Sequence, residues 1–428
     1  MSGVWPRLGF TRWGSLEQNT AIMADGFILA NGTAVLADRL LEKATIVARG
    51  GIIVAVGTES PAEIAASRPE CRGFPVVDCA GAYVLPRLVE MHIHGAFGIG
   101  FESVTGPGEL LTVARELRAR GVGTFVPTIL WDEAAVSRLA AAIEESGLPE
   151  SALPGIYIEG PFVNPEKRGG IGLDRIRAPD AELCRRILRA ARGKLKIMAL
   201  APELPGVEAL YPILSEAGVR ISLGHSAADA GVATPKGPFS VTHLFNAMSG
   251  LDHRRGGLVN LALAGRTSWA ELNADGIHVN ADCMAVALRC LPPDKLVLTS
   301  DAVVAAGLPC GEYSYFGSPV RSGPDGVRYV ESGTLMGSNR LGMEIVASYR
   351  RASGASLAAA VASMSRTPSD VLGFGPATRA CLEIGAAADL FIWDRELSSC
   401  RRPEALLDAA PQGSGRTGAV KNAQGKTK

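Results

Sequence analysis

The 428-residue sequence lacks the features of several protein classes. Its 43 basic and 43 acidic residues cancel, so there is no bulk field to attract nucleic acid or an anionic membrane. No apolar run reaches the roughly 18–20 residues that span a bilayer, and the first twenty residues hold no continuous apolar segment of a signal peptide. The eight cysteines include no CxxC pair, which indicates reduced thiols. We therefore expect a cytoplasmic protein that binds neither nucleic acid nor membrane.

Short apolar runs alternate with turn residues between about 24 and 84. The segments GFILANG, ATIVARGGIIVAVG and FPVVDCAGAYVLP predict a small antiparallel sheet with a hairpin turn at Gly50-Gly51. A strand-like run near the C-terminus, EIGAAADLFIWD (383–394), is expected to complete this sheet. The predicted β-sandwich domain is therefore discontinuous, with parts at 22–84 and 383–410. Residues 1–21 are interpreted as a polar extension, and residues 411–428 as a disordered basic tail.

Between 85 and 382, strand-like runs alternate with amphipathic helices. After Asp132, a candidate N-cap, apolar side chains recur with helical spacing at Val136, Leu139, Ala140 and Ile143. Eight strands are expected, at 88–95, 121–130, 155–160, 195–202, 219–226, 239–247, 269–276 and 295–302. Eight βα units in about 290 residues fit an α/β fold of the (β/α)8 TIM-barrel type. A doubly wound sheet is the competing arrangement, but no glycine-rich phosphate fingerprint supports it.

Histidine is scarce, and most of its six positions follow a pattern. Side chains that can bind a metal lie within or just after predicted strands: His92, His94, Glu159, His225, His243 and Asp301. Because the C-terminal ends of barrel strands meet at one mouth, we expect these groups to converge. Imidazoles and carboxylates together favour one or two divalent ions, with Zn or Fe expected. A lone HxH motif is more often structural, so the inference rests on its coincidence with the other groups.

Asp301 also suits a catalytic role. A carboxylate beside a metal-activated water can accept its proton as the water attacks a carbonyl, and can then return the proton to the leaving amine. The alternative is a structural aspartate that caps the following helix, which would be favoured if Asp301 stood alone.

Segments along almost the whole chain, from about 24 to 394, resemble the N-acetylglucosamine-6-phosphate deacetylases of the amidohydrolase superfamily. They are EMHIHG (90–95), EGPFVNPEKRG (159–169), APE (201–203), GHS (224–226), THLFNAM (242–248), ADGIHV (274–279), TSDAVVAAGLP (299–309), GTLMGS (333–338) and GAAADL (385–390). HxH and GHS indicate only the superfamily, whereas EGPF with THLFNAM indicates the deacetylases. The resemblance implies a metal-dependent homodimer that hydrolyses the N-acetyl amide of N-acetyl-D-glucosamine 6-phosphate.

The resemblance also implies roles for individual residues. Glu159, His225 and His243 match the metal ligands of the family. His92 and His94 suit a second ion bridged by Glu159, and Asp301 matches the catalytic aspartate. The substrate contacts carried over are Gly170, Asn246, Ala247, Arg254, Asp275, Gly276, Ile277, His278, Leu335, Met336, Gly337 and Ser338. Among these, Arg254 is expected to bind the phosphate and His278 to orient a sugar hydroxyl, with the partner subunit completing the phosphate pocket.

Some positions depart from the family pattern. Ile171 stands where a histidine that polarises the scissile carbonyl is expected, Arg87 replaces a glycine, and Arg255 and Gly256 replace an acidic residue and a proline. A missing oxyanion donor typically lowers the rate about 10²–10³-fold. Two alternatives therefore stay open: a deacylase of a different N-acyl amino sugar, phosphorylated or not, and a non-catalytic scaffold.

Overall fold

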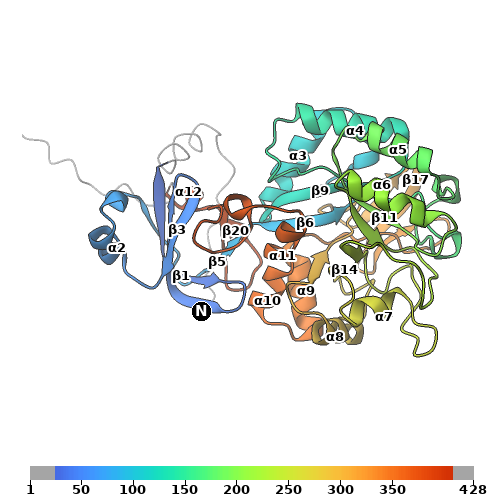
Figure 1. Ribbon diagram of the computed structural model, residues 1–428. Coiled ribbons are helices and arrows are strands. Elements are labelled where there is room, and N and C mark those ends of the chain that lie inside the picture. The colour runs from blue at the N-terminus through green and yellow to red at the C-terminus, as the bar shows by residue number, and fades with distance from the viewer. Residues whose placement is uncertain (1–24, 408–428) are drawn as a thin grey trace, which may run out of the picture.

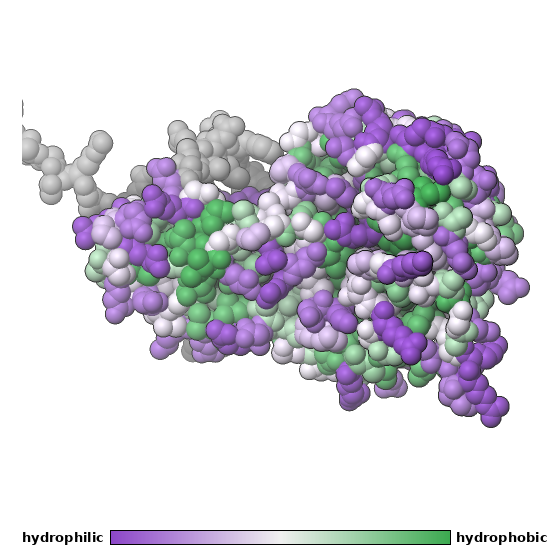
Figure 2. Space-filling model, viewed as in Figure 1, coloured by the Kyte–Doolittle hydropathy of each residue, from purple (hydrophilic) through white to green (hydrophobic). Residues whose placement is uncertain are grey.

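The computed structural model describes residues 25–407, which form a barrel and a smaller sheet (Figure 1). The predicted extension at 1–21 and tail at 411–428 lie outside these residues. On the face shown in Figure 2, hydrophilic residues spread over the outer surface of the barrel, and hydrophobic residues gather on the small sheet. None of the described helices is long and apolar enough to cross a membrane.

The barrel consists of eight parallel strands, as predicted. Hydrogen bonds join them in the order β6 (Leu88–Ile93), β9 (Val122–Leu130), β10 (Ile156–Glu159), β11 (Leu195–Leu200), β12 (Arg220–Leu223), β13 (Phe239–Val241), β14 (Trp269–Asn273) and β15 (Leu296–Thr299). The segment after β15 returns to β6, where the His94 N–H donates to the Ala302 carbonyl at 2.7 Å and Ile93 bridges Ala302 in parallel. This contact brings the last strand back to the first, so the structure is a barrel and not a doubly wound sheet.

Helices cover the outside of the barrel: α3 (Pro107–Arg118), α4 (Glu133–Glu145), α5 (Ala181–Ala190), α6 (Leu210–Glu216), α7 (Leu258–Leu263), α8 (Ala281–Cys290) and α9 (Met343–Ser353). The shorter α10 (Leu357–Ala362) and α11 (Arg366–Val371) lie on the side toward the small sheet (Figure 1). Helix α4 begins where the sequence predicts, because the Asp132 carboxylate accepts a hydrogen bond from the Ala135 N–H at 2.9 Å.

Apolar side chains fill the barrel interior. The cluster comprises Val89, Met91, Val126, Tyr157, Ile197, Ala199, Trp269 and Val297, closed by Leu372 and Ala380 from the segment after α11. The interior is therefore a packed core, as is usual for this fold. The polar side chains described below lie at the C-terminal ends of the strands, above this core.

The small sheet draws on both ends of the described chain. Its strands are β1 (Gly26–Val35), β2 (Leu40–Arg49), β3 (Ile52–Gly57), β4 (Val76–Asp78), β5 (Tyr83–Pro86), β19 (Leu390–Trp393) and β20 (Cys400–Arg401), and α12 (Pro403–Leu407) follows. β19 pairs with β5, so the predicted return of the C-terminal segment is confirmed. These strands belong to one hydrogen-bonded sheet, and apolar clusters lie on both of its faces.

The prediction of a wholly antiparallel small sheet is wrong. β1 pairs antiparallel with β2 but parallel with β4 and β5. Parallel pairing requires a crossover, and here the crossover contains α2 (Pro61–Ser67), a helix with a capping box between Ser60 and Glu63. The hairpin turn between β2 and β3 is as predicted, since Gly50 and Gly51 have φ values of 56° and 76°, which glycine adopts at little cost.

A three-stranded antiparallel sheet follows β15 and was not predicted. It consists of β16 (Gly311–Tyr315), β17 (Ser318–Gly323) and β18 (Gly326–Tyr329). The short pair β7 (Gly95–Ala96) and β8 (Ile99–Gly100) lies directly after β6. Both the three-stranded sheet and the β7–β8 pair follow barrel strands at the C-terminal mouth. The three-stranded sheet brings Tyr315, Phe316 and Tyr329 to the cavity there.

Arg87, which replaces the expected glycine, is a buried link between the small sheet and the barrel. Its side chain is 3% exposed. Nε donates to Thr124 Oγ1 at 2.9 Å, Nη2 donates to the Thr378 carbonyl, and Nη1 lies 3.8 Å from Asp389. Asp389 also pairs with Arg118 at 2.6 Å. One guanidinium therefore contacts β9, the segment after α11 and the residue before β19.

We expect Arg87→Met to lower the free energy of unfolding by about 2–4 kcal/mol, because buried acceptors lose their donor. Arg39→Met is the control, since the Arg39–Asp38 pair is exposed and such pairs contribute about 0–1 kcal/mol. Urea unfolding of both variants provides the comparison. Equal midpoints for the two variants would show that Arg87 does not hold the two parts together.

Candidate metal centre

The structure brings all six predicted metal-binding side chains to the C-terminal mouth of the barrel. Glu159 is the last residue of β10, and His92 and His94 lie within and just after β6. His225, His243 and Asp301 each follow the end of their strand by two residues. This regular placement is the reason that residues far apart in sequence meet.

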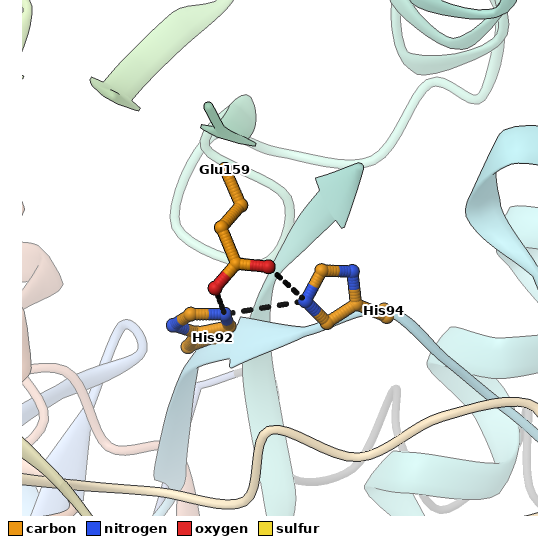
Figure 3. Close-up of side chains that lie close together, drawn as sticks. All are labelled: His92, His94 and Glu159. Carbon is orange, nitrogen blue, oxygen red and sulfur yellow. Dashed lines mark hydrogen bonds and ion pairs between the residues drawn. The ribbon is translucent and has the colours of Figure 1, made fainter. Parts of the chain in front are cut away.

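Glu159 lies at the centre of the group. Its Oε1 is 2.9 Å from His225 Nε2 and 3.0 Å from His243 Nε2, and its Oε2 is 3.4 Å from His94 Nε2. His92 Nε2 lies 3.7 Å from Oε1. Figure 3 shows the carboxylate extending from β10 toward the rings of His92 and His94. The side chains form two triads that share Glu159, and the ligand atoms within each triad lie within 4.8 Å of one another.

The contacts between ring nitrogens show that these residues fit a cation. His225 Nε2 and His243 Nε2 are 2.9 Å apart, and His92 Nε2 and His94 Nε2 are 3.3 Å apart. Protons on both nitrogens of either pair would point into the same space. Two nitrogen ligands at about 2.1 Å from a tetrahedral ion lie roughly 3.4 Å apart, close to these separations. Imidazole nitrogen with carboxylate oxygen is a donor set that suits divalent transition metals.

The outer nitrogens of two rings fix the tautomers that metal binding requires. His225 Nδ1 lies 2.9 Å from the Lys167 carbonyl, so Nδ1–H donates and Nε2 keeps its lone pair. His92 Nδ1 lies 3.0 Å from Glu271 Oε2 in the same manner. Within the described residues, the outer nitrogens of His94 and His243 have no hydrogen-bond partner.

The electrostatics favour an ionised Glu159. Burial opposes ionisation, but without a bound ion the ring nitrogens can carry protons, and then the charge of His225 and hydrogen bonds from His225, His243 and His94 hold the pKa of this carboxyl well below its ordinary value. An ionised carboxylate is the form that binds a metal.

Three residues of the centre have a left-handed backbone. The φ values are 47° for His225, 29° for His243 and 50° for Asp301, a region that costs non-glycine residues of order 1–3 kcal/mol. Asp301 is held there by two backbone hydrogen bonds, from its N–H to the His92 carbonyl at 3.0 Å and to its carbonyl from the Ser338 N–H at 2.8 Å. The centre is therefore built on backbone that the surrounding structure must stabilise.

A cavity of about 230 Å³ opens above the centre. On its polar side lie Asn246, Ala247 and His278. His278 Nδ1 is 2.7 Å from Asp275 Oδ2. Burial lowers the pKa of His278, but this hydrogen bond and the charge of Asp275 outweigh it and raise the pKa above its ordinary value. The rest of the wall is largely apolar and consists of Leu130, Ile171, Val303, Tyr315, Phe316, Tyr329, Leu335 and Met336.

The predicted substrate residues divide by position. Those that line the cavity are Gly170, Asn246, Ala247, His278, Leu335, Met336 and Gly337. Asp275 and Ser338 lie behind the cavity wall. Asp275 contacts the His278 ring, and the Ser338 N–H donates to the Asp301 carbonyl. Gly276 and Ile277 are the residues between Asp275 and His278. Arg254 is exposed and does not line the cavity of its own chain.

Two sets of residues were missed from the sequence. The first is the network of Glu271, Tyr157 and Thr242 behind His92. A signal for Glu271 existed, namely a carboxylate in the middle of the strand-like run WAELNADG. The second set, Tyr315, Phe316 and Tyr329, belongs to the unpredicted sheet, and nothing in its local sequence connects it to the mouth.

Comparison with known proteins agrees with this geometry. Residues 83–424 match the amidohydrolase family. The chain belongs to this family. It is 35% identical over 339 residues to the N-acetylglucosamine-6-phosphate deacetylase of Mus musculus, across 75% of this chain and 81% of that protein. It is 31% identical over 296 residues to the N-acetylgalactosamine-6-phosphate deacetylase of Escherichia coli O157:H7, across 67% and 78% of the two chains.

A solved amidohydrolase structure matches as well. It is a mutant N-acetyl-D-glucosamine-6-phosphate deacetylase from Mycobacterium smegmatis in complex with N-acetyl-D-glucosamine-6-phosphate, with a TM-score of 0.76 and 26% identity over 89% of this chain and 98% of that one. Together these matches confirm the predicted family, the N-acetylglucosamine-6-phosphate deacetylases, and the barrel fold. A divalent metal is consistent with both the family and the His/Glu triads.

We expect His225→Ala to lose the metal ion held by the triad of Glu159, His225 and His243, because two ligands remain where three are needed. The control is His253→Ala, since this histidine is exposed on a loop. Metal bound per chain after gel filtration is measured by plasma mass spectrometry, with circular dichroism to verify folding. Full metal content in a folded His225→Ala protein would contradict the proposed site.

Proposed function

We propose that the protein hydrolyses the N-acetyl amide of N-acetyl-D-glucosamine 6-phosphate, giving D-glucosamine 6-phosphate and acetate. The observation that carries the proposal is the cluster around Glu159, with Asp301 beside it, at the mouth of a barrel in a chain of the deacetylase family. A scaffold without chemistry would have no need of six converging ligands on strained backbone.

Glu159, His225 and His243 are assigned to one ion, and His92 and His94 with Glu159 to a second, with Zn or Fe as the expected metal. Asp301 Oδ1 faces the second group from 3.4 Å at His94 Nε2 and 3.6 Å at His92 Nε2. When bound, such an ion supplies Lewis acidity, which polarises a carbonyl oxygen and makes water acidic enough to attack near neutral pH.

Asp301 is assigned the proton transfers. Its carboxylate accepts the proton that the attacking water loses as the C–O bond forms. It then delivers that proton to the amide nitrogen as the C–N bond breaks, so the amino sugar leaves as a neutral amine. The side chain is 16% exposed, which leaves it accessible from the cavity, and its backbone hydrogen bonds to His92 and Ser338 fix its position.

The polar side of the cavity is assigned to the sugar. His278, oriented by Asp275, directs its ring toward a hydroxyl, and Asn246 and the backbone of Ala247 provide neutral donors and acceptors. Gly170 and the segment 335–338 close the cavity near the sugar.

The phosphate is assigned to Arg254 of a partner subunit in a homodimer. Arg254 is exposed and lies outside the cavity of its own chain. The same loop carries Leu251, which is 67% exposed. An exposed leucine beside the exposed Arg254 is suited to a contact between subunits, where the leucine is buried and the arginine reaches an anion.

A second candidate, a deacylase of a different N-acyl amino sugar, is favoured by Ile171. This side chain is 4% exposed and packs with Leu130 and Val163. Leu130 lies beside Glu159 in the register of β9 and β10, so an apolar wall borders the metal centre where the family places a histidine. The Escherichia coli relative, named for N-acetylgalactosamine 6-phosphate, is an example of a related protein with a different sugar.

Asp301→Asn should lower kcat by about 10²–10⁴-fold, because the amide cannot accept the proton from water. The ion held by Glu159, His225 and His243 should remain bound. Asp38→Asn, at an exposed position far from the mouth, is the matched control. Steady-state kinetics with parallel metal analysis tests the assignment, and ordinary turnover by Asp301→Asn would refute the proton-transfer scheme.

Arg254→Ala should chiefly reduce kcat/KM for N-acetylglucosamine 6-phosphate and leave N-acetylglucosamine itself nearly unaffected, because the lost contact is with the phosphate. Arg185→Ala, an exposed arginine on α5, serves as the control. Equal losses on both substrates would remove the phosphate assignment and favour the second candidate.

Mixed dimers show which subunit supplies the arginine. If Arg254 acts across the interface, a dimer of one Arg254→Ala subunit and one Asp301→Asn subunit contains one intact site and regains activity. If Arg254 acts within its own chain, both sites of the mixed dimer are damaged and activity stays low. Co-expression with two affinity tags isolates the mixed species for assay.

A further inference from the structure

Glu271 is a buried carboxylate for which the proposed reaction has no role. It lies on β14 and is fully buried. Oε2 is 3.0 Å from His92 Nδ1 and accepts from Thr242 Oγ1 at 3.0 Å, and Oε1 accepts from the Tyr157 hydroxyl at 3.3 Å. Burying a carboxylate is costly unless it is hydrogen-bonded and its charge is compensated. Two of these partners are neutral hydroxyl groups. Of the three, His92 is therefore the one that can place positive charge, its own or that of an ion it binds, near the Glu271 carboxylate.

This contact determines which nitrogen of His92 is available. A carboxylate only accepts hydrogen bonds, so Nδ1 must carry the proton that it donates to Glu271. In the neutral ring, Nε2 is then left with a lone pair. Nε2 faces three other atoms with lone pairs: His94 Nε2 at 3.3 Å, Asp301 Oδ1 at 3.6 Å and Glu159 Oε1 at 3.7 Å. A cation bound among these atoms would have all four as ligands, and its charge would offset the repulsion between their lone pairs.

We infer that Glu271 is a positioning residue that makes His92 a ligand for the second ion, by holding its Nδ1–H tautomer and by supplying a negative charge behind the ring. The inference rests on the two-ion centre proposed above. A carboxylate behind a ligating histidine raises the basicity of that histidine, and loss of such a partner typically weakens metal binding about 10–100-fold.

The two triads differ in this respect. His225, in the triad with His243, is oriented by the neutral carbonyl of Lys167, and no carboxylate from residues 25–407 is among the partners of its Nδ1. His94 Nδ1 has no hydrogen-bond partner within the described residues. Glu271 therefore acts on the ion held by His92 and His94, and its removal should leave the ion at His225 and His243 in place.

The test is a metal titration of the chelator-treated protein with Zn²⁺, followed by calorimetry and by metal content per chain. Wild type should bind two ions. Glu271→Gln keeps an acceptor but loses the charge, so affinity for one ion should fall about 10-fold. Glu271→Leu loses both, and the fall should approach about 100-fold. The affinity for the other ion should stay unchanged in both variants, which a general loss of folding would not produce.

Glu90→Gln is the matched control. Glu90 is also a fully buried carboxylate, on the same strand as His92. Its Oε1 accepts from the backbone N–H groups of Ser300 at 3.1 Å and His92 at 3.4 Å, not from the imidazole. This variant should bind both ions with wild-type affinity. Two ions bound at wild-type affinity by Glu271→Leu would overturn the inference, whereas one ion in wild type would overturn the two-ion centre and the inference with it.

A measurement on wild type covers the case in which the Glu271 variants fail to fold. In protein labelled with ¹⁵N-histidine and loaded with Zn²⁺, the His92 ring should show a proton on Nδ1 and none on Nε2 in long-range ¹H–¹⁵N spectra. His92→Gln identifies the signal by its disappearance. A proton on His92 Nε2 in the zinc-loaded protein would overturn the inference.

Discussion

The carboxylate of Glu159 is the group on which the mouth of the barrel depends. It is 7% exposed and surrounded by the Nε2 atoms of His92, His94, His225 and His243. A charge taken out of water in this way must be matched by positive charge. The imidazoles supply that charge as protonated rings or as the ligands of a cation, and the crowding of their nitrogens favours the cation. The rest of the site holds these four rings around the two carboxylate oxygens of Glu159.

Holding them there requires unusual backbone, and the barrel makes that possible. Side chains along a strand alternate between the two faces of the sheet. His225, His243 and Asp301 instead lie on left-handed backbone just beyond their strands, where their side chains meet the other groups at the mouth. Strain of this size persists only where the surroundings determine the conformation. Below the site, the packed interior fixes the strand ends, and beside it the return of the chain from Asp301 to His92 fixes the last turn.

The sequence predicted those parts of the molecule that follow local patterns. Each barrel strand is a short apolar run, and each proposed ligand lies at the end of such a run, so position along the chain was enough to predict that they meet. The contacts that were missed join distant residues through geometry alone: His92 and Glu271 are 179 residues apart. The same holds for Arg87 and Thr378, 291 residues apart. No local signal marks the contact between Arg87 and Thr378, and the carboxylate within the strand-like run WAELNADG does not show which histidine Glu271 contacts.

The errors in the small sheet and the missing three-stranded sheet have another cause. The first arose because a seven-residue helix, α2, was not recognised as a crossover, so a parallel neighbour was interpreted as an antiparallel one. The second arose because β16 is only five residues long and its inward positions hold a glycine and two tyrosines, with no aliphatic side chain. Its tyrosine face is buried by packing against Val303, Val304 and Ala305, which follow β15, and this long-range contact is not visible in the local sequence.

In the proposed function, the metal centre at the base of the cavity carries out the reaction, and the wall of the cavity selects the substrate. The roles proposed for Glu159 and Asp301 define a hydrolytic reaction, and in this proposal the surrounding wall decides which amide reaches them. At the position where the family resemblance predicts a histidine, Ile171 offers no hydrogen-bond donor to a substrate carbonyl. A cation is the other means of polarising that group, since a Lewis acid polarises a carbonyl without a proton donor. The proposed second ion, and therefore the carboxylate of Glu271 behind His92, gains importance in this chain because an isoleucine, Ile171, lines the cavity.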